Sequence, residues 1–250
     1  EPGMGVQATV SVAEGQRVTH VRTGRNGVVV AATDRGRLYH WVFDEAEPKL
    51  TDVARVGGDE ITALEFVIGG SSVVVGTARG EVTSWFRAEM PDSGEALVRA
   101  HEFEPQGSAV VGFAVSPRER SFAALGADGS LVLRHQTSER TLARLEGVPA
   151  AGIMLVAPKA DALYLLADGS LMPFDLDNPH PEISWRTLFG KVWYEGYARP
   201  EYVWQSTGAT DDFESKLSLV PLVFGTIKGT LYAMLFAIPL SVMGALYTSQ

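Results

Sequence analysis

The fold is decided by Ala127-Asp128-Gly129-Ser130-Leu131, a tight turn that carries one short apolar run into the next. This kind of turn occurs four times, and its glycines lie 44, 49 and 40 residues apart. Each turn follows a run of about five apolar residues, several of them β-branched or aromatic, which is typical of strands. The other three turns are Asp34-Arg35-Gly36-Arg37-Leu38, Ala78-Arg79-Gly80-Glu81-Val82 and Ala167-Asp168-Gly169-Ser170-Leu171.

The turns predict hairpins, because glycine adopts the positive φ of a two-residue Asp-Gly turn without a steric penalty. A tryptophan falls five residues after the first two glycines, at Trp41 and Trp85. Phe174 takes that place in the fourth unit, whereas Arg134 departs from the pattern in the third. One four-stranded sheet per unit cannot bury its own faces, so the units are expected to stack radially as propeller blades.

The predicted fold is therefore mainly β, with four blades of the WD40 or quinoprotein-like kind over residues 1–180. Four blades are the low end for a propeller, so we expect an incomplete ring, or further blades before Glu1. An all-β sandwich with regular hairpins is the alternative.

The composition argues against several classes of function. The 250 residues include 21 Lys and Arg against 30 Asp and Glu, a net charge of −9 that argues against nucleic acid as a partner. There is no cysteine, which excludes disulfides, thiolate metal sites and cysteine nucleophiles. The N-terminus has neither the basic nor the apolar region of a signal peptide, and the chain stops just after an apolar run. We interpret the chain as a fragment of a longer protein.

The composition changes at Asn178-Pro179-His180-Pro181, where the prolines mark the expected end of the β domain. Residues 181–216 form an aromatic-rich segment, here called the elbow. Amphipathic rings favour the membrane–water interface, which is the preferred interpretation, and a cap packed on the last blade is the alternative. The aromatic residues concerned are Trp185, Phe189, Trp193, Tyr194, Tyr197, Tyr202 and Trp204.

A membrane helix is predicted over Pro221–Tyr247, inside residues 217–250, where Lys228 is the only charge. A helix of this length spans roughly 40 Å, enough for the hydrocarbon core with some tilt. Pro239 is expected to kink it. Lys228 is expected to snorkel to the near interface, and a pore-facing cation that contacts an anionic substrate is the sharper alternative. A buried helix of a soluble protein is the alternative for the whole segment.

Small residues recur at every fourth position of this helix, a stripe that lets other helix backbones approach closely in lipid. A lone anchor has no need for such a stripe, so partner helices are expected. The stripe consists of Gly225, Gly229, Ala233, Ala237, Ser241 and Ala245.

The C-terminal part of the chain resembles the phosphate ABC transporter permease family PstC, in its long form. The resemblance comprises an aromatic motif, a Pro-Leu-x-x-Gly-Thr entry, an Ala-x-Pro-Leu stretch and an Ala-x-Tyr ending. The stretches that carry it are Ser184–Tyr194, Leu219–Thr230, Ala237–Leu240 and Gly244–Ser249.

The resemblance implies a permease subunit of a binding-protein-dependent importer in a bacterial inner membrane, with residues 1–216 in the periplasm and phosphate as the transported ion. It implies three protein partners besides membrane lipid: a second permease subunit, an ATP-binding subunit and a periplasmic phosphate-binding protein. The β domain resembles the inserted periplasmic domain of the long forms and is expected to be an accessory interaction module.

An enzyme is not expected, because the sequence has no phosphate-binding loop, His-Glu-x-x-His motif or Gly-x-Ser-x-Gly motif. ATP hydrolysis is expected in the partner ATPase, and no cofactor or metal is expected. The five histidines are interpreted as strand or turn residues. The cluster Asp211–Glu214 is interpreted as a solvated loop, with a cation site as the alternative. The second function hypothesis is a membrane-anchored propeller that serves as a scaffold or sensor without transport.

Overall fold

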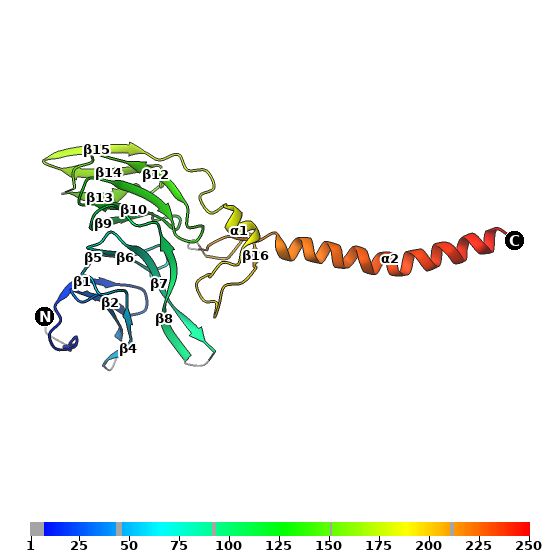
Figure 1. Ribbon diagram of the computed structural model, residues 1–250, viewed down its shortest axis with the longest axis horizontal. Helices are drawn as coiled ribbons and strands as arrows, with labels where there is room; N and C mark the ends of the chain where they lie inside the picture. Colours follow the sequence, from blue (N-terminus) through cyan, green and yellow to red (C-terminus); the bar gives the residue numbers. More distant parts are fainter. Residues whose placement is uncertain (1–7, 44–46, 92–93, 151, 211–212) are drawn as a thin grey trace, which may run out of the picture.

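The computed structural model describes residues 8–43, 47–91, 94–150, 152–210 and 213–250. Its β part consists of successive antiparallel sheets that fan out as propeller blades (Figure 1). Blades 1 and 2 each have four strands in sequence order. Their strands are β1 (Val18–Thr23), β2 (Val28–Thr33), β3 (Arg37–Phe43), β4 (Pro48–Arg55), β5 (Ile61–Phe66), β6 (Val73–Thr77), β7 (Val82–Met90) and β8 (Gly94–Phe103).

Blade 3 also has four strands, whereas blade 4 has three within the described residues, so the expectation of four strands in every unit is wrong for the last one. The chain leaves β15 for the elbow instead of returning along the blade. Pro173 lies in this edge strand, where proline is tolerated. The strands are β9 (Val110–Val115), β10 (Ser121–Gly126), β11 (Leu131–His135), β12 (Thr141–Leu145), β13 (Ile153–Val156), β14 (Ala162–Ala167) and β15 (Ser170–Asp175).

The first strands of successive blades lie side by side, β1 next to β5, β5 next to β9 and β9 next to β13. Apolar side chains from both neighbours fill the space between each pair of blades. The inner strands are therefore apolar on both faces, and β6 and β10 are buried throughout. Within the described chain, the blades form an open arc with β1 at one end and β13 at the other (Figure 1).

The two tryptophans of the repeat are buried between or beside blades, Trp41 at 4% and Trp85 at 6% exposure. Arg134, which replaces the aromatic residue in blade 3, is fully buried. Its guanidinium lies 5.8 Å from the centroid of the Phe103 ring and donates to the carbonyl of Glu104 at 2.5 Å. Burial lowers the pKa of Arg134 to about 10. A cation over an aromatic face thus takes the place of an aromatic side chain.

The four glycine turns join the second and third strands of each blade, so they lie in the middle of the units and not at their ends. All four glycines have the predicted positive φ, between +65° and +82°. Only Asp168 and Gly169 form the expected two-residue turn, with φ of 51° and 73°. In the other three turns the glycine N–H donates to the carbonyl three residues earlier, at 3.0–3.2 Å. The expectation of two-residue turns is therefore wrong for Gly36, Gly80 and Gly129, where a longer turn needs positive φ only at its last residue.

Antiparallel strands place the loops at two opposite ends of the blades. The glycine turns and the connectors between blades share one end, here called the distal end. The loops that follow β1, β5 and β9 share the other end, where the elbow packs (Figure 1). The elbow contains α1 (Trp185–Phe189), capped by Ser184, and the short pair β16 (Trp204–Gln205) and β17 (Lys216–Leu217).

The helix α2 (Val220–Thr248) leaves the elbow and extends away from the propeller (Figure 1). Its bounds agree closely with the predicted Pro221–Tyr247, with proline in the first turn and Pro239 inside. Its 29 residues reach a mean hydropathy of 1.7 over the most apolar window, and none is buried within the described chain. Length and composition are those of a membrane span.

Candidate functional site

The elbow packs across the end of the blades that is opposite the distal end. Arg120 lies at the centre of this contact, here called the junction. Arg120 follows β9 and precedes β10, and its side chain is 8% exposed. Its guanidinium forms ion pairs with two elbow carboxylates, Glu195 and, at 3.1 Å, Glu214. It also donates to the hydroxyl of Ser72 in blade 2 at 3.4 Å. Thr137 donates to the second carboxylate, so residues of blades 2 and 3 and the elbow share one network.

Removing a guanidinium from water is costly, and the cost is offset only when opposite charges and hydrogen bonds surround it. Two carboxylates from one segment surround Arg120, so undocking of the elbow would leave charges of both signs without their partners. The junction is therefore expected to hold the elbow in one position.

A second set of contacts ties the start of the elbow to blade 3. Glu139 pairs with the ring of His101 at 3.0 Å and with Arg186 of α1. The hydroxyl of Ser138 donates to the carbonyl of Pro181 at 2.8 Å. The entry to α1 is thus fixed to the loop between β11 and β12.

Aromatic packing completes the junction. Trp193 meets Phe86 of β7 edge-to-face, with ring centroids 5.8 Å apart. Tyr194 is 2% exposed, and its burial raises its pKa to about 12. The ammonium of Lys216 lies 4.8 Å from the centroid of the Phe213 ring and also faces Tyr194, and burial lowers its pKa. The aromatic elbow thereby becomes a packed layer on the blades.

The elbow aromatics divide into two groups. Trp193 packs on Phe86 of blade 2, and Tyr194 packs on Tyr197. Together with the ion pair of Glu195 and Arg120, this makes the elbow a cap, as the alternative interpretation predicts, but on blades 2 and 3 instead of the last blade. The remaining four are exposed: Trp185 and Phe189 lie on α1 at the start of the elbow, and Tyr202 and Trp204 lie between the docked residues and α2. Their exposed fractions are 81% for Trp185, 46% for Phe189, 41% for Tyr202 and 42% for Trp204. Only this second group remains available for the predicted contact with the membrane–water interface.

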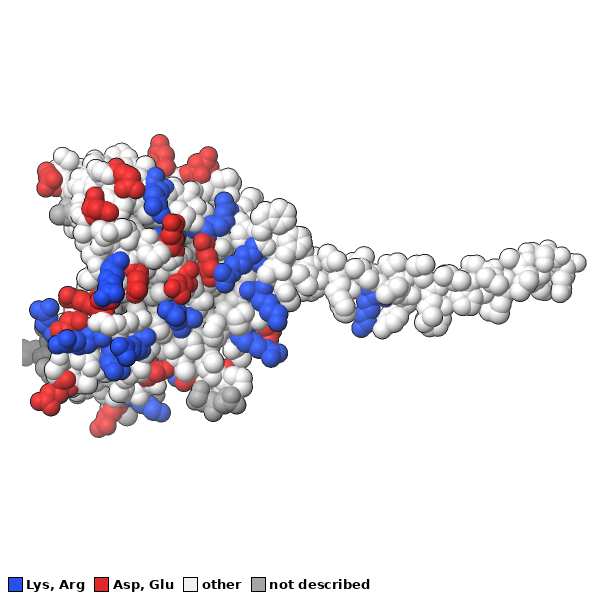
Figure 2. Space-filling view, in the orientation of Figure 1, with Lys and Arg blue, Asp and Glu red and all other residues white. Residues whose placement is uncertain are grey.

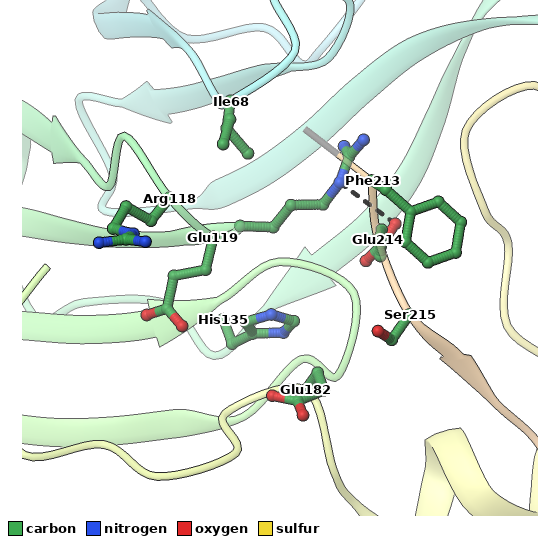
Figure 3. Close-up of a pocket in the computed structure, with 9 residues that line it drawn as sticks. Ile68, Arg118, Glu119, His135, Glu182, Phe213, Glu214 and Ser215 are labelled. Atoms are coloured by element: carbon green, nitrogen blue, oxygen red, sulfur yellow. Dashed lines mark ion pairs between the residues drawn. The ribbon is translucent and has the colours of Figure 1, made fainter. Parts of the chain in front are cut away.

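A cavity of about 140 Å³ opens where the β9–β10 loop faces the elbow (Figure 3). Figure 3 shows Glu119, His135 and Glu182 on one side of it and Phe213 and Glu214 on the other. Burial raises the pKa of Glu119 and lowers the pKa of His135 to about 3, so the imidazole is neutral at physiological pH. Among the described residues, no group of three or more acidic or histidine side chains could hold a metal ion. The cavity is lined by charged side chains of the blades and the elbow, as expected of an ionic junction.

Each of the first three repeat glycines receives the connector that leaves its blade. Their carbonyls accept backbone N–H groups at 2.8–2.9 Å, and added Cβ atoms would lie 2.3–2.7 Å from connector carbonyl oxygens. At Gly169, no described atom lies within 4 Å of that position. The connector donors are Val56 on Gly36, Gln106 on Gly80 and Val148 on Gly129. These glycines are therefore sites of close backbone packing and do not form a ligand site.

The predicted membrane residues all lie on α2. The stripe of Gly225, Gly229, Ala233, Ala237, Ser241 and Ala245 is exposed and meets no other described element. Figure 2 shows α2 as uncharged apart from Lys228. The ammonium of Lys228 lies 5.7 Å from the centroid of the Tyr232 ring, and the residue is not brought to the junction.

Two further sequence interpretations can be compared with the structure. His40, His101 and His135 are strand residues, as expected. In the acidic cluster, Asp211 and Asp212 lie outside the described residues, and the solvated-loop interpretation is wrong for Glu214, which is 11% exposed and paired with arginine. No sequence signal identified Arg120, because its partners lie 75 and 94 residues further along the chain.

Comparisons with known proteins support the fold and leave the family open. A scan against protein-family models finds no match, and a search of curated proteins finds no relative. Among solved structures the chain is similar to the computationally designed Ika8 protein, with a TM-score of 0.51 and 19% identity. The match covers 63% of this chain and 45% of the designed one, so the chain spans less than half of that structure. The chain thus carries a four-bladed, propeller-like domain followed by one long apolar helix.

Proposed function

We propose that this chain is part of a permease subunit of a binding-protein-dependent ABC importer that takes up inorganic phosphate. The proposal places α2 in the bacterial inner membrane, with the propeller on the periplasmic side. Its partners are a second permease subunit, an ATP-binding subunit that hydrolyses ATP and a periplasmic phosphate-binding protein.

The observation that carries the proposal is the small-residue stripe of α2. A helix that only anchors a domain in lipid gains nothing from a groove of glycine and alanine along its length. All six stripe residues are exposed in the described chain, so the groove is available for helices of a transport domain. Lys228, two turns into α2, adds a cation close to the entry of that domain.

The propeller fits the role of an accessory module. Its ionic and aromatic junction with the elbow lies directly before α2, and the backbone N–H of Leu219 donates to the carbonyl of Leu188 in α1 at 2.8 Å. A protein that binds at the distal end of the blades would therefore be held at a set position relative to the membrane helix. Phosphate is proposed as the ion because of the resemblance of Ser184–Tyr194 and Leu219–Thr230 to phosphate permeases.

The test is uptake of labelled phosphate by cells that express the natural protein and lack their own high-affinity uptake system. The double substitution Gly229→Leu and Ala233→Leu fills the stripe and is expected to abolish uptake, because partner helices can no longer approach. The matched control is Val223→Leu, which enlarges a side chain off the stripe and should leave uptake intact. Membrane levels of each variant are compared by immunoblot.

Unchanged phosphate uptake after deletion of the whole gene would overturn the assignment to phosphate. Full uptake with the stripe filled would overturn the permease proposal and favour the membrane-anchored scaffold or sensor.

A further inference from the structure

The outer face of blade 4 is apolar and uncovered. Ile153 and Leu155 of β13 are 62% and 63% exposed, and Leu166 and Leu171 on the neighbouring strands are 45% and 61% exposed. The strand register pairs Ile153 with Leu166, and Leu166 with Leu171, so the side chains share one face. The opposite face is buried against blade 3.

This face has the composition of a surface between blades. In blades 2 and 3 both faces of the sheet carry apolar side chains and both are covered by a neighbouring blade. A solvent-facing antiparallel sheet would instead alternate with polar residues. Contiguous exposed apolar surface of this kind marks an interaction site.

At the other end of the arc, the outer face of blade 1 is half covered. Tyr39 and Trp41 stack with ring centroids 5.5 Å apart, and Val12 packs on them. Val21 and Val53 are 49% and 37% exposed. The described part of the segment before β1, residues 8–17, therefore occupies only part of this face.

That segment enters blade 1 in the way a connector enters a following blade. The carbonyl of Glu60, the last residue before β5, accepts the N–H of Ala78 at 3.0 Å. The carbonyl of Ala109, the last residue before β9, accepts the N–H of Ala127 at 2.8 Å. The carbonyl of Arg17, the last residue before β1, makes the equivalent contact at 3.0 Å.

Val12 extends the correspondence. It contacts the apolar residues of the blade that follows it, as Val56 and Val148 of the two valine-containing connectors do. Residues 12–17 thus have the contacts of a connector that arrives from a preceding blade.

Within the described residues, the chain does not continue the arc beyond blade 4. Connectors leave their blades at the distal end and contact the repeat glycine, but β15 ends at the opposite end, and no described atom lies within 4 Å of a Cβ built on Gly169. The described residues therefore supply no blade that covers Ile153 and Leu155, whereas a ring that closes from the side of blade 1 would place one there. The match to 45% of a longer propeller chain agrees with an arc that is part of a larger ring.

We propose that the four blades are the C-terminal part of a closed propeller ring, whose remaining blades belong to the same polypeptide on the N-terminal side of β1. One of them covers the face of Val21 and Val53, and another covers the face of Ile153 and Leu155. Ring closure removes both open faces, which is how propellers protect their blades.

The 250 residues contain no cysteine, so single thiols introduced there report accessibility without background in this chain, and any cysteine in the rest of the natural protein is first replaced by serine. Val21→Cys, Leu155→Cys and the exposed control Ala198→Cys are introduced separately into the natural protein and into the 250-residue chain. Maleimide labelling rates are measured on detergent-purified protein that light scattering shows to be monomeric. Expression and unfolding midpoints confirm that each variant folds.

In the natural monomer, the thiols at positions 21 and 155 are expected to react at least roughly tenfold more slowly than the control, because a covered face opens only by local unfolding. In the 250-residue chain all three should react at similar rates. Rapid reaction in the natural monomer would overturn the proposal. Protection that appears only in dimers would also overturn it, because the cover would then be a second copy of the chain.

Discussion

Gly80 and Gly169 occupy the same place in two blades, yet their surroundings differ. Both have positive φ, +82° and +73°, which the spacing of the turns predicts. An added Cβ at Gly80 would lie 2.3 Å from the carbonyl oxygen of Gln106, whereas one at Gly169 would have no described atom within 4 Å. At the scale of the residue, glycine serves two purposes, and only one of them, the backbone angle, is visible in the turn itself.

The two glycines provide a matched pair of substitutions. Gly169→Ala is expected to lower the free energy of unfolding by about 1 kcal/mol, the strain of alanine at positive φ. Gly80→Ala is expected to cost about 3 kcal/mol or more, because the connector backbone must also shift. Chemical denaturation followed by tryptophan fluorescence measures both. Equal losses of unfolding free energy in the two variants would contradict the role of Gly80 in packing against the connector.

The buried imidazole of His135 predicts a dependence of stability on pH. Burial lowers its pKa to about 3, below the value of about 6.5 expected in the unfolded chain. The stabilisation is therefore complete above pH 6.5 and is lost as the pH falls, by about 1.4 kcal/mol per pH unit for this group. His40, whose pKa burial lowers to about 4, adds a slope of the same sign.

His135→Gln should reduce the slope of unfolding free energy between pH 6 and 5, because glutamine does not titrate. Urea midpoints at several pH values measure it, and His180→Gln at an exposed loop position is the control. A slope that is unchanged in His135→Gln would show that the imidazole is not held neutral.

At the scale of the element, the elbow is defined by what it packs against. Its aromatic content alone allows two placements, at a lipid interface or on the blades, and the structure divides the residues between them. The ion pairs of Arg120 with Glu195 and Glu214 decide which part is docked. The parts of the elbow around Glu195 and Glu214 are thereby fixed, and α2 begins shortly after Glu214.

Arg120→Gln is expected to loosen the elbow. Breaking a buried pair leaves two carboxylates without a cation and costs about 3–5 kcal/mol, so amide exchange in residues 193–197 and 216–218 should accelerate roughly a hundredfold or more. Arg199→Gln removes the exposed pair with Glu201, whose side chains are 77% and 44% exposed, and should change little. Exchange rates that match in the two variants would rule out a special role for Arg120.

At the scale of the whole molecule, the blades have two ends with different contents. The distal end carries the glycine turns and connectors, and the opposite end carries the junction and α2 (Figure 1). The open arc leaves one apolar face at blade 4, and the junction leaves the small-residue stripe of α2 free. The apolar face fits the proposed closure of the propeller ring, and the stripe fits the proposed contact with helices of a transport domain.

The sequence by itself determined the mainly β class, the four repeat units, the positive φ of their glycines and the bounds of α2. These features depend on local patterns: turn residues, strand-length apolar runs and a long charge-free segment. The helix stripe and Lys228 were visible for the same reason.

Only the tertiary structure decided the turn lengths, the three-stranded last blade and the junction. Arg120 contacts carboxylates that are distant in sequence. The residues around Glu214 have the composition of a solvated loop, and only the fold shows that Glu214 pairs with an arginine of another element. The physical reason is that ion pairs and interblade contacts depend on how sheets stack. Stacking brings together residues that no local spacing relates.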